Sequence, residues 1–171
     1  LRACPNIHLT IVGDDSSDGT KEKVFAMIKK FGIQDKSTVI KSVAFENLHA
    51  FMKDFDVFIH PSCTTQDGDC EGGAPVVLLD AQATGLPVIA TMHCDIPEVV
   101  VHESTGLLAP ERDVEKISDF IVRFYAMGHE EYNSFSKKAR EHVLQNYNAP
   151  VCGAALRHIY ETLIERHLKK A

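Results

Sequence analysis

The sequence predicts an α/β protein with a Rossmann-like, mostly parallel sheet, helices on both faces and further helices at its C-terminal end. The first observation is alternation, since short apolar runs of strand length are separated by segments with helical spacing. The second is the run 56–60, which is almost wholly apolar, as expected for a parallel strand covered on both faces. The third is that after Pro110 apolar residues recur only at helical spacing.

The expected elements follow from these patterns in chain order. Strands are predicted over 6–12, 38–42, 56–60 and 87–91. The helices between them are predicted from apolar residues at helical spacing: Val24, Met27, Ile28 and Phe31, then Leu48, Phe51, Met52 and Phe55. Three C-terminal stripes are expected to face the core: Val114, Ile117, Ile121 and Phe124; Tyr132, Phe135, Ala139 and Val143; Val151, Ala155, Ile159 and Leu163.

Composition restricts the class of protein. A chain of 171 residues suits one domain, and the net charge of -6 argues against a nonspecific nucleic-acid binder. No apolar run approaches the roughly 18 residues that span a bilayer, and no signal peptide is expected; contact with a membrane surface is left open. Five cysteines at irregular spacing favour thiols in a reducing compartment, so we expect a cytoplasmic protein.

The segment 71–88 carries the clearest chemical signal, a glycine turn followed by a helix and a buried strand. Pro75 suits the first helical position, and Gly85 is placed to end the helix in a left-handed conformation. The positive end of the helix dipole would then hold an anion such as a phosphate at the N–H groups of Gly73, Ala74 and Val76.

Two carboxylates, Glu71 and Asp80, flank this anion site. Carboxylates beside a phosphate site accept hydrogen bonds from hydroxyl groups. Hydroxyls together with a pyrophosphate describe a nucleotide sugar, which is therefore the leading ligand hypothesis.

This segment resembles the signature of the donor-binding, C-terminal domain of GT-B glycosyltransferases of family 4, the glycosyl transferases group 1. Four further blocks resemble that domain in the same order: Ile11 to Asp14, Asp56 to Ser62, Asp95 to Val100, and Thr105 to Pro110. The resemblance runs from about residue 7 to about residue 126. Five ordered blocks are specific for the family and not for a substrate.

The resemblance implies a hexosyltransferase that moves a sugar from a UDP- or GDP-sugar to a glycan, lipid or small-molecule acceptor. Transfer would retain configuration and need no metal or other cofactor. Glu71 would be the catalytic residue, contacting the transferred sugar. The other implied donor contacts are Asp80 with the ribose, the backbone near Val43 with the base, and Gly72, Gly73, Ala74, Pro75 and Val76 with the phosphates.

Simpler interpretations stay open for these positions. Glu71 could be an acid stabilised by the helix dipole, Asp80 a solvated helix residue, and Val43 a packing valine. The family usually has Glu at the second acidic position and one residue less between the two acids, so Gly73 reads as an insertion. Gly13 fits a turn glycine at the end of a strand.

The chain is interpreted as one domain fragment, with a nucleotide-sugar-binding Rossmann-like region at 1–110 and C-terminal helices at 111–171. The family's domain begins with a strand–helix unit whose Arg and Lys meet the donor phosphates, and an acceptor domain precedes it. Neither is recognised in this sequence, so we expect weak donor binding and no transfer by this chain alone. The local site offers carboxylates and no nearby basic residue: Asp67, Asp69, Glu71 and Asp80.

Other functions are weighed against the transferase. A metal site is disfavoured because the spacing of the candidate ligands matches no zinc pattern: His60, Cys63, Cys70, His93 and Cys94. His93 and Glu98 are candidates for nucleotide contact, and no Cys–His pair predicts a nucleophile. A nucleotide-sugar epimerase, a sugar-phosphate synthase or a non-catalytic nucleotide-binding module of the same architecture remains possible.

Overall fold

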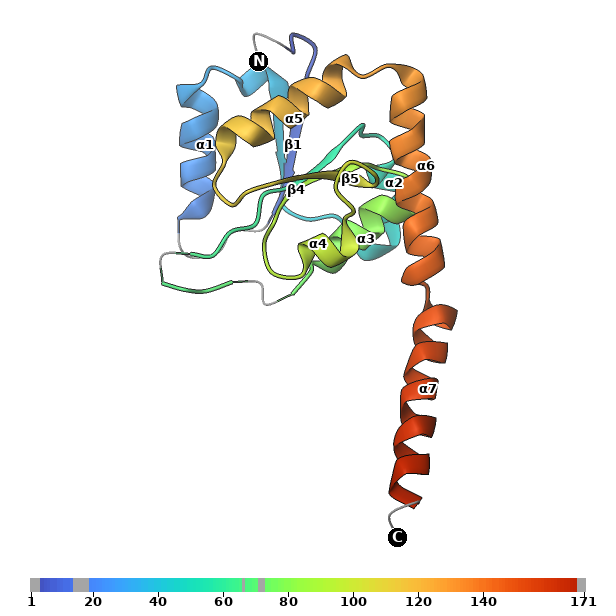
Figure 1. Cartoon of the computed structure of the whole chain (residues 1–171). Helices are drawn as coiled ribbons and strands as arrows, with labels where there is room; N and C mark the ends of the chain where they lie inside the picture. Colours follow the sequence, from blue (N-terminus) through green and yellow to red (C-terminus); the bar gives the residue numbers. More distant parts are fainter. Residues whose placement is uncertain (1–3, 14–18, 66, 71–72, 169–171) are drawn as a thin grey trace. The chain divides into compact units, whose positions relative to one another are not determined.

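The computed structural model describes residues 4–13, 19–65, 67–70 and 73–168 (Figure 1). Glu71 and Gly72, for which the sequence predicts a catalytic and a donor-binding role, lie outside the described residues. The chain divides into two compact units, residues 1–54 and 55–171, and each has its own parallel sheet. The predicted boundary between a nucleotide-sugar-binding region and C-terminal helices, at 110/111, is not tested by this division into units and stays a prediction.

The first unit contains a two-stranded sheet and its helices. The two strands are parallel, with Leu9 opposite Ser37. Helix α1 ends before Gly32, whose φ of 63° is the left-handed conformation expected of a glycine stop. The elements are β1 (Leu9–Val12), α1 (Thr20–Lys30), the 3-10 helix η1 (Gln34–Lys36), β2 (Ser37–Ile40) and α2 (Phe45–Met52).

The second unit contains a three-stranded parallel sheet of order β3-β4-β5. Val88 of β4 lies opposite Phe58 of β3 and Gly106 of β5. Its elements are β3 (Phe58–His60), α3 (Val76–Ala83), β4 (Val88–Thr91), α4 (Ile96–Val99), β5 (Gly106–Ala109), α5 (Val114–Ala126), α6 (His129–Asn146) and α7 (Ala149–Leu168). The parallel strands and flanking helices agree with the predicted fold class.

The core of the second unit joins this sheet to α5 and α6. Phe124 of α5 and Phe135 of α6 meet edge to face, with ring centroids 5.4 Å apart, beside the β-strand side chains of Ile89 and Leu107. Helix α3 packs against α6 (Figure 1). A Cβ at Gly106 would lie 2.3 Å from the carbonyl oxygen of Val88, so β5 can approach β4 only with glycine at this position.

Two local expectations are wrong, and one strand was not predicted. Pro75 is the N-cap residue of α3 and not its first helical residue, because its ψ of 127° is not helical. Phe55 lies beyond the end of α2, which stops at Met52. The 106–109 segment, which forms β5, was not predicted as a strand.

The predicted burial of the C-terminal stripes holds on α6, holds in part on α5 and fails on α7. Phe135, Ala139 and Val143 of α6 are buried. On α5 Phe124 of the predicted stripe is buried, whereas Val114 at its other end is 77% exposed.

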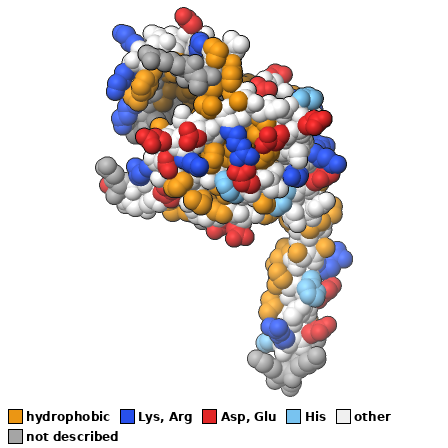
Figure 2. Space-filling view, turned by 45° about the horizontal axis from the view of Figure 1, so that its top comes forward, with side chains coloured by type: hydrophobic (Ala, Val, Ile, Leu, Met, Phe, Trp, Pro, Cys, Tyr) orange, Lys and Arg blue, Asp and Glu red, His pale blue; other side chains and the backbone are white. Residues whose placement is uncertain are grey.

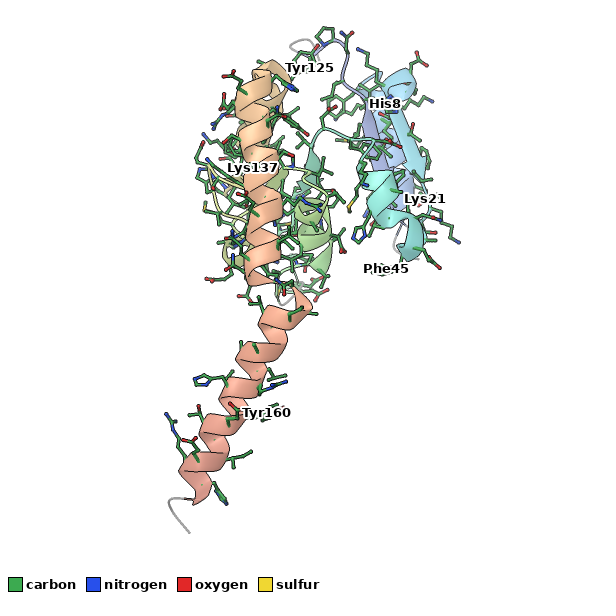
Figure 3. All side chains as sticks on the ribbon, turned by 90° about the vertical axis from the view of Figure 1, so that its right-hand side faces the viewer. His8, Lys21, Phe45, Tyr125, Lys137 and Tyr160 are labelled. Atoms are coloured by element: carbon green, nitrogen blue, oxygen red, sulfur yellow. The ribbon has the colours of Figure 1, made fainter. Side chains whose placement is uncertain are left out.

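The stripe on α7 is exposed and not core-facing. Val151, Ile159 and Leu163 are 40%, 53% and 54% exposed, and Figure 2 shows hydrophobic side chains along this helix. Tyr160, labelled in Figure 3, is 59% exposed. Within its unit α7 contacts mainly α6. Its apolar residues recur at helical spacing, but in the described residues they do not pack into a core.

None of the helices that the structure describes is both long and apolar enough to cross a membrane.

Candidate functional site

The candidate site lies at the carboxyl edge of the β3-β4-β5 sheet. Because the three strands are parallel, the segments that follow them emerge at one edge. These segments are residues 61–75 after β3, 92–95 after β4 and 110–113 after β5. Ligands of open α/β sheets bind at this edge.

The turn before α3 leads into an uncapped helix N-terminus. Pro75, the N-cap, offers no side-chain hydrogen bond to the first turn, and its carbonyl oxygen accepts from Leu78 N at 3.0 Å. The N–H groups of Val76 and Val77 have no acceptor within the helix, as in any first turn. Val76 is 69% exposed, so this helix end is accessible to an anion.

Gly73, which precedes α3, lies near the segment after β4. A Cβ built on Gly73 would lie 3.9 Å from Oδ2 of Asp95, which is ordinary van der Waals separation. Gly73 therefore lies beside the β4 segment, and sterics alone do not require glycine there. Asp95 adds a carboxylate to the side of the helix end where a phosphate was expected.

Asp80, the second predicted acid, is half-buried and is the fifth residue of α3. At 1.5 Å per residue it lies about 6 Å along the axis from Val76. Val43 is half-buried in the segment between β2 and α2 of the first unit. The binding roles of Val43, Asp80 and residues 73–76 stay predictions.

One hydrogen-bond network joins all three strand-end segments. His93, which is 1% exposed after β4, places Nδ1 2.7 Å from Oε1 of Glu111 after β5. The other carboxylate oxygen of Glu111 accepts from the backbone N–H of Thr64 after β3 at 2.9 Å. Arg112 donates to the carbonyl oxygen of Thr64, and Thr91 donates to that of Ser62. The edge is therefore a connected structure and not three separate loops.

The network favours the ionised form of Glu111. The hydrogen bonds from His93, first, and from the Thr64 N–H hold the pKa of Glu111 below its usual range. An ionised carboxylate can only accept, so Nδ1 of His93 is the donor in its contact with Glu111. Sγ of Cys94 lies 3.3 Å from the other ring nitrogen, Nε2.

Two residues of this edge have left-handed backbones although neither is glycine. Cys94 has a φ of 44° and Arg112 a φ of 63°. Such a conformation costs a non-glycine residue about 1 kcal/mol. Both residues adjoin a member of the His93–Glu111 pair, so the packed network compensates for local strain at both of its ends.

Several candidates from the sequence have structural roles here. Gly13 ends β1 and donates its N–H to the carbonyl oxygen of Ile40 at 3.0 Å, which fits its turn interpretation. The backbone carbonyl of Glu98 accepts from the Tyr147 hydroxyl at 2.6 Å. His93 is buried against Glu111, so its imidazole serves the network. Among the described residues no three His, Cys, Asp or Glu side chains form a metal-binding group.

Sequence reasoning missed two features of this edge. It found no basic residue near the carboxylates of residues 67–80, whereas Arg112 reaches Thr64 of the same loop. It found no Cys–His pair, whereas Cys94 and His93 are hydrogen bonded. The available signal was that His93-Cys94 and Glu111 both directly follow strands whose carboxyl ends share one edge.

The comparison with protein families decides the membership of the chain. The family model for glycosyl transferases group 1 matches residues 1–142. The chain belongs to this family.

Two curated relatives agree with this assignment. WcaL of Salmonella typhimurium, described as a colanic acid biosynthesis glycosyltransferase, is 34% identical over 146 residues, which cover 84% of this chain and 35% of the relative. The amylovoran biosynthesis glycosyltransferase AmsK of Erwinia amylovora is 34% identical over 132 residues, covering 75% of this chain and 32% of the relative. The chain thus spans about a third of the length of these relatives.

Solved structures show the same fold. Sucrose-phosphate synthase from Thermosynechococcus elongatus aligns with a TM-score of 0.77 at 24% identity, over 93% of this chain and 39% of that chain. HepE from Anabaena, solved with UDP-glucose, aligns with a TM-score of 0.75 at 18% identity, over 94% of this chain and 42% of that chain. The predicted GT-B-type α/β fold is therefore confirmed.

Proposed function

We propose that this chain is the donor-binding part of a retaining GT-B glycosyltransferase of family 4. The donor would be a UDP- or GDP-sugar, and the acceptor a glycan, a lipid or a small molecule bound by another domain. The observation that carries the proposal is the uncapped N-terminus of α3, which lies at the carboxyl edge of the sheet. In a chain of the glycosyl transferases group 1 family, that position suits a pyrophosphate.

Each donor group has a proposed partner. The pyrophosphate would accept hydrogen bonds from the backbone N–H groups of residues 72–74 and 76, with Pro75 fixing the turn between them. Asp80 would accept hydrogen bonds from the ribose hydroxyls, because its offset of about 6 Å along α3 matches a group next to the phosphates. The backbone at Val43 would meet the base, and Glu71 would contact the transferred sugar as the catalytic residue.

The proposed chemistry is electrostatic. As the bond between the sugar and the phosphate breaks, negative charge grows on the leaving phosphate. Helix amides aimed at that charge stabilise it without reorganisation, and basic groups upstream in the complete enzyme would add to this effect. Neither a metal nor another cofactor is required by this scheme, and closure on the acceptor domain would complete the site.

The names of the relatives guide the choice of donor and acceptor. WcaL and AmsK are both named for polysaccharide biosynthesis, and we propose the same process for the complete enzyme, in the cytoplasm. HepE was solved with UDP-glucose, and a relative from Mycobacterium tuberculosis, 37% identical over 91 residues, is named as GDP-mannose-dependent. Donors with either nucleobase, uracil or guanine, are therefore included in the binding experiment.

A thermal-shift titration tests the donor site. The chain is titrated to several millimolar with UDP-glucose, GDP-mannose, UDP, GDP and ADP, because a ligand of the folded state raises the melting midpoint with its concentration. We expect a shift with one base and a dissociation constant weaker than low millimolar. Tighter binding would contradict the need for the upstream basic pair.

Variants separate the proposed site from nonspecific binding. Asp80→Ala removes the proposed ribose acceptor, whereas Asp119→Ala removes an exposed acid of α5 and is the matched control. We expect the ligand-induced shift to fall in Asp80→Ala and to persist in Asp119→Ala. Equal shifts in both variants, or no shift after the upstream strand–helix unit is restored, would reject the donor-binding role.

A further inference from the structure

We propose that Cys94 is an activated thiol, a site of oxidation by peroxides and of alkylation by soft electrophiles, prepared by His93 and Glu111. This role is separate from glycosyl transfer and uses none of the residues proposed to hold the donor. It rests on three side chains at the carboxyl edge of β4 and β5.

The three groups have the order and spacing of a proton relay. Sγ of Cys94 lies 3.3 Å from Nε2 of His93, and Nδ1 of the same ring lies 2.7 Å from Oε1 of Glu111. A nucleophile, a base beside it and a carboxylate that orients the base are the parts of an activated nucleophile. Cys94 therefore differs from a solitary surface cysteine.

The backbone at Cys94 makes the contact possible. Successive side chains of an extended chain point to opposite sides, so neighbouring residues seldom touch. The positive φ of 44° at Cys94 turns the chain out of the extended conformation directly after His93. The strained turn thus brings the thiol to the ring of the preceding residue, and strain of this kind gathers at functional sites.

His93 and Cys94 differ in burial, and the difference suits their roles as base and nucleophile. His93 is 1% exposed, so its ring has one fixed orientation, whereas Cys94 is exposed to reagents. Glu111 is anchored by the Thr64 N–H, and its lowered pKa keeps it ionised near neutral pH. A carboxylate in that state stabilises the imidazolium that forms when His93 takes the thiol proton.

The other exposed cysteines lack this arrangement. Cys70 and Cys152 are exposed, and neither bonds to a histidine in the described part of the chain. Sγ of Cys152 donates to the carbonyl oxygen of Asn146 at 3.9 Å. Cys70 and Cys152 therefore serve as internal reference thiols for Cys94.

The reaction with hydrogen peroxide balances as follows. Cys94 gives its proton to His93 Nε2, and the thiolate sulfur attacks one peroxide oxygen. The S–O bond forms, the O–O bond breaks, and the departing hydroxide takes the proton from His93 and leaves as water. Sulfur is oxidised by two electrons to a sulfenic acid while the peroxide is reduced.

Competitive labelling of the wild-type chain tests the proposal. The chain is treated with limiting iodoacetamide at pH 6.5, and mass spectrometry of its peptides gives the rate at each cysteine. We expect Cys94 to react at least about ten times faster than Cys70 and Cys152, because an ordinary thiol is almost fully protonated at this pH. The ratio should shrink by pH 9. Equal rates at pH 6.5 would overturn the proposal.

Two charge-removing variants test the relay. Glu111→Gln preserves the shape of the network and removes its charge, while Glu115→Gln, at an exposed position of α5, is the matched control. After thermal melts have shown both variants folded, we expect slower alkylation of Cys94 in Glu111→Gln alone. In wild type, dimedone should trap a sulfenic acid at Cys94 before Cys70 under dilute peroxide. An unchanged Cys94 rate in Glu111→Gln, or trapping at Cys70 first, would contradict the relay.

Discussion

The two parallel sheets of this chain have similar strand sequences and very different burial. In the second unit every residue of β4 and β5 is buried. In the first unit no residue of β1 or β2 is fully buried, and Leu9 and Val12 are 38% and 44% exposed. The apolar composition of a strand thus predicts that it forms, while its burial depends on the elements around it.

The neighbours of each sheet account for the difference. β4 has a hydrogen-bonded strand on each side and α5 packed on it, whereas β1 pairs only with β2 within its unit. Leu9 and Ile11 of β1, with Val24 and Met27 of α1 and its C-cap residue Phe31, line an open apolar groove. Substitutions at equivalent positions of the two sheets should therefore differ in cost.

The largest expected contrast is between two glycines. In Gly106→Ala the new Cβ would meet the Val88 carbonyl oxygen at 2.3 Å and Cγ1 of Val100 at 2.9 Å, so the strands must separate. We expect a loss of about 4 kcal/mol of unfolding free energy. Gly13→Ala has no atom within 4 Å of its new Cβ and should change stability by less than about 0.5 kcal/mol.

Urea unfolding measures both variants. The chain has four tyrosines and no tryptophan, and all four tyrosines lie in the second unit, so tyrosine fluorescence reports that unit while far-UV circular dichroism reports both. Equal losses of unfolding free energy in the two glycine variants would contradict the expected difference between the two sheets.

The second contrast is between two leucines. Leu107→Ala opens a cavity at a fully buried position of β5 and should cost about 3 kcal/mol. Leu9→Ala, at a 38% exposed position of β1, should cost less than about 1 kcal/mol. Hydrogen exchange read by mass spectrometry would resolve each sheet. A larger loss for Leu9→Ala would show that an unseen partner covers the first sheet.

A third pair compares the packed and exposed C-terminal helices. The Tyr132 hydroxyl of α6 donates to the Asp56 carbonyl oxygen at 3.0 Å, and burial raises the pKa of Tyr132. Tyr132→Phe should cost about 1 kcal/mol by thermal melting. Tyr160→Phe, on exposed α7, should have no measurable effect, and a loss there as large as that of Tyr132→Phe would refute the exposure of α7.

The smallest expected effect is a change in how the stability of the chain depends on pH. Burial of His142 on α6 lowers its pKa below the ordinary value of about 6.5, so the unfolded chain binds a proton that the folded chain resists. Stability should therefore rise with pH up to and slightly above 6.5 and fall as the pH drops below it. In melts from pH 5 to 8, His142→Gln should flatten this slope, and His129→Gln is the matched control. An unchanged slope in His142→Gln would exclude this residue as the cause.

Local patterns predicted most of the fold. The apolar runs at 56–60 and 87–91 gave β3 and β4, and Gly85 ends α3 with a φ of 82°, as expected. What the patterns missed depends on distant contacts. The exposure of the α7 stripe reflects the lack of a packing partner, which helical spacing does not encode.

The candidate site shows the same limit. The start of α3 was predicted from adjacent residues, and its position in the structure differs from that prediction by one residue. The hydrogen bond between His93 and Glu111 joins residues 18 positions apart, and no spacing rule links them. Only the shared edge of parallel strands brings them together.

The most direct test of the account is an amide-resolved NMR titration of this chain with UDP-glucose and GDP-mannose. If the start of α3 binds the donor, one of the two ligands shifts the resonances of Gly73, Ala74, Val76 and Val77 most, with changes at Asp80 and Val43, and Asp80→Ala weakens all of these shifts. Shifts confined to the apolar groove of β1 and α1, with the start of α3 unchanged, would contradict a donor site at this helix.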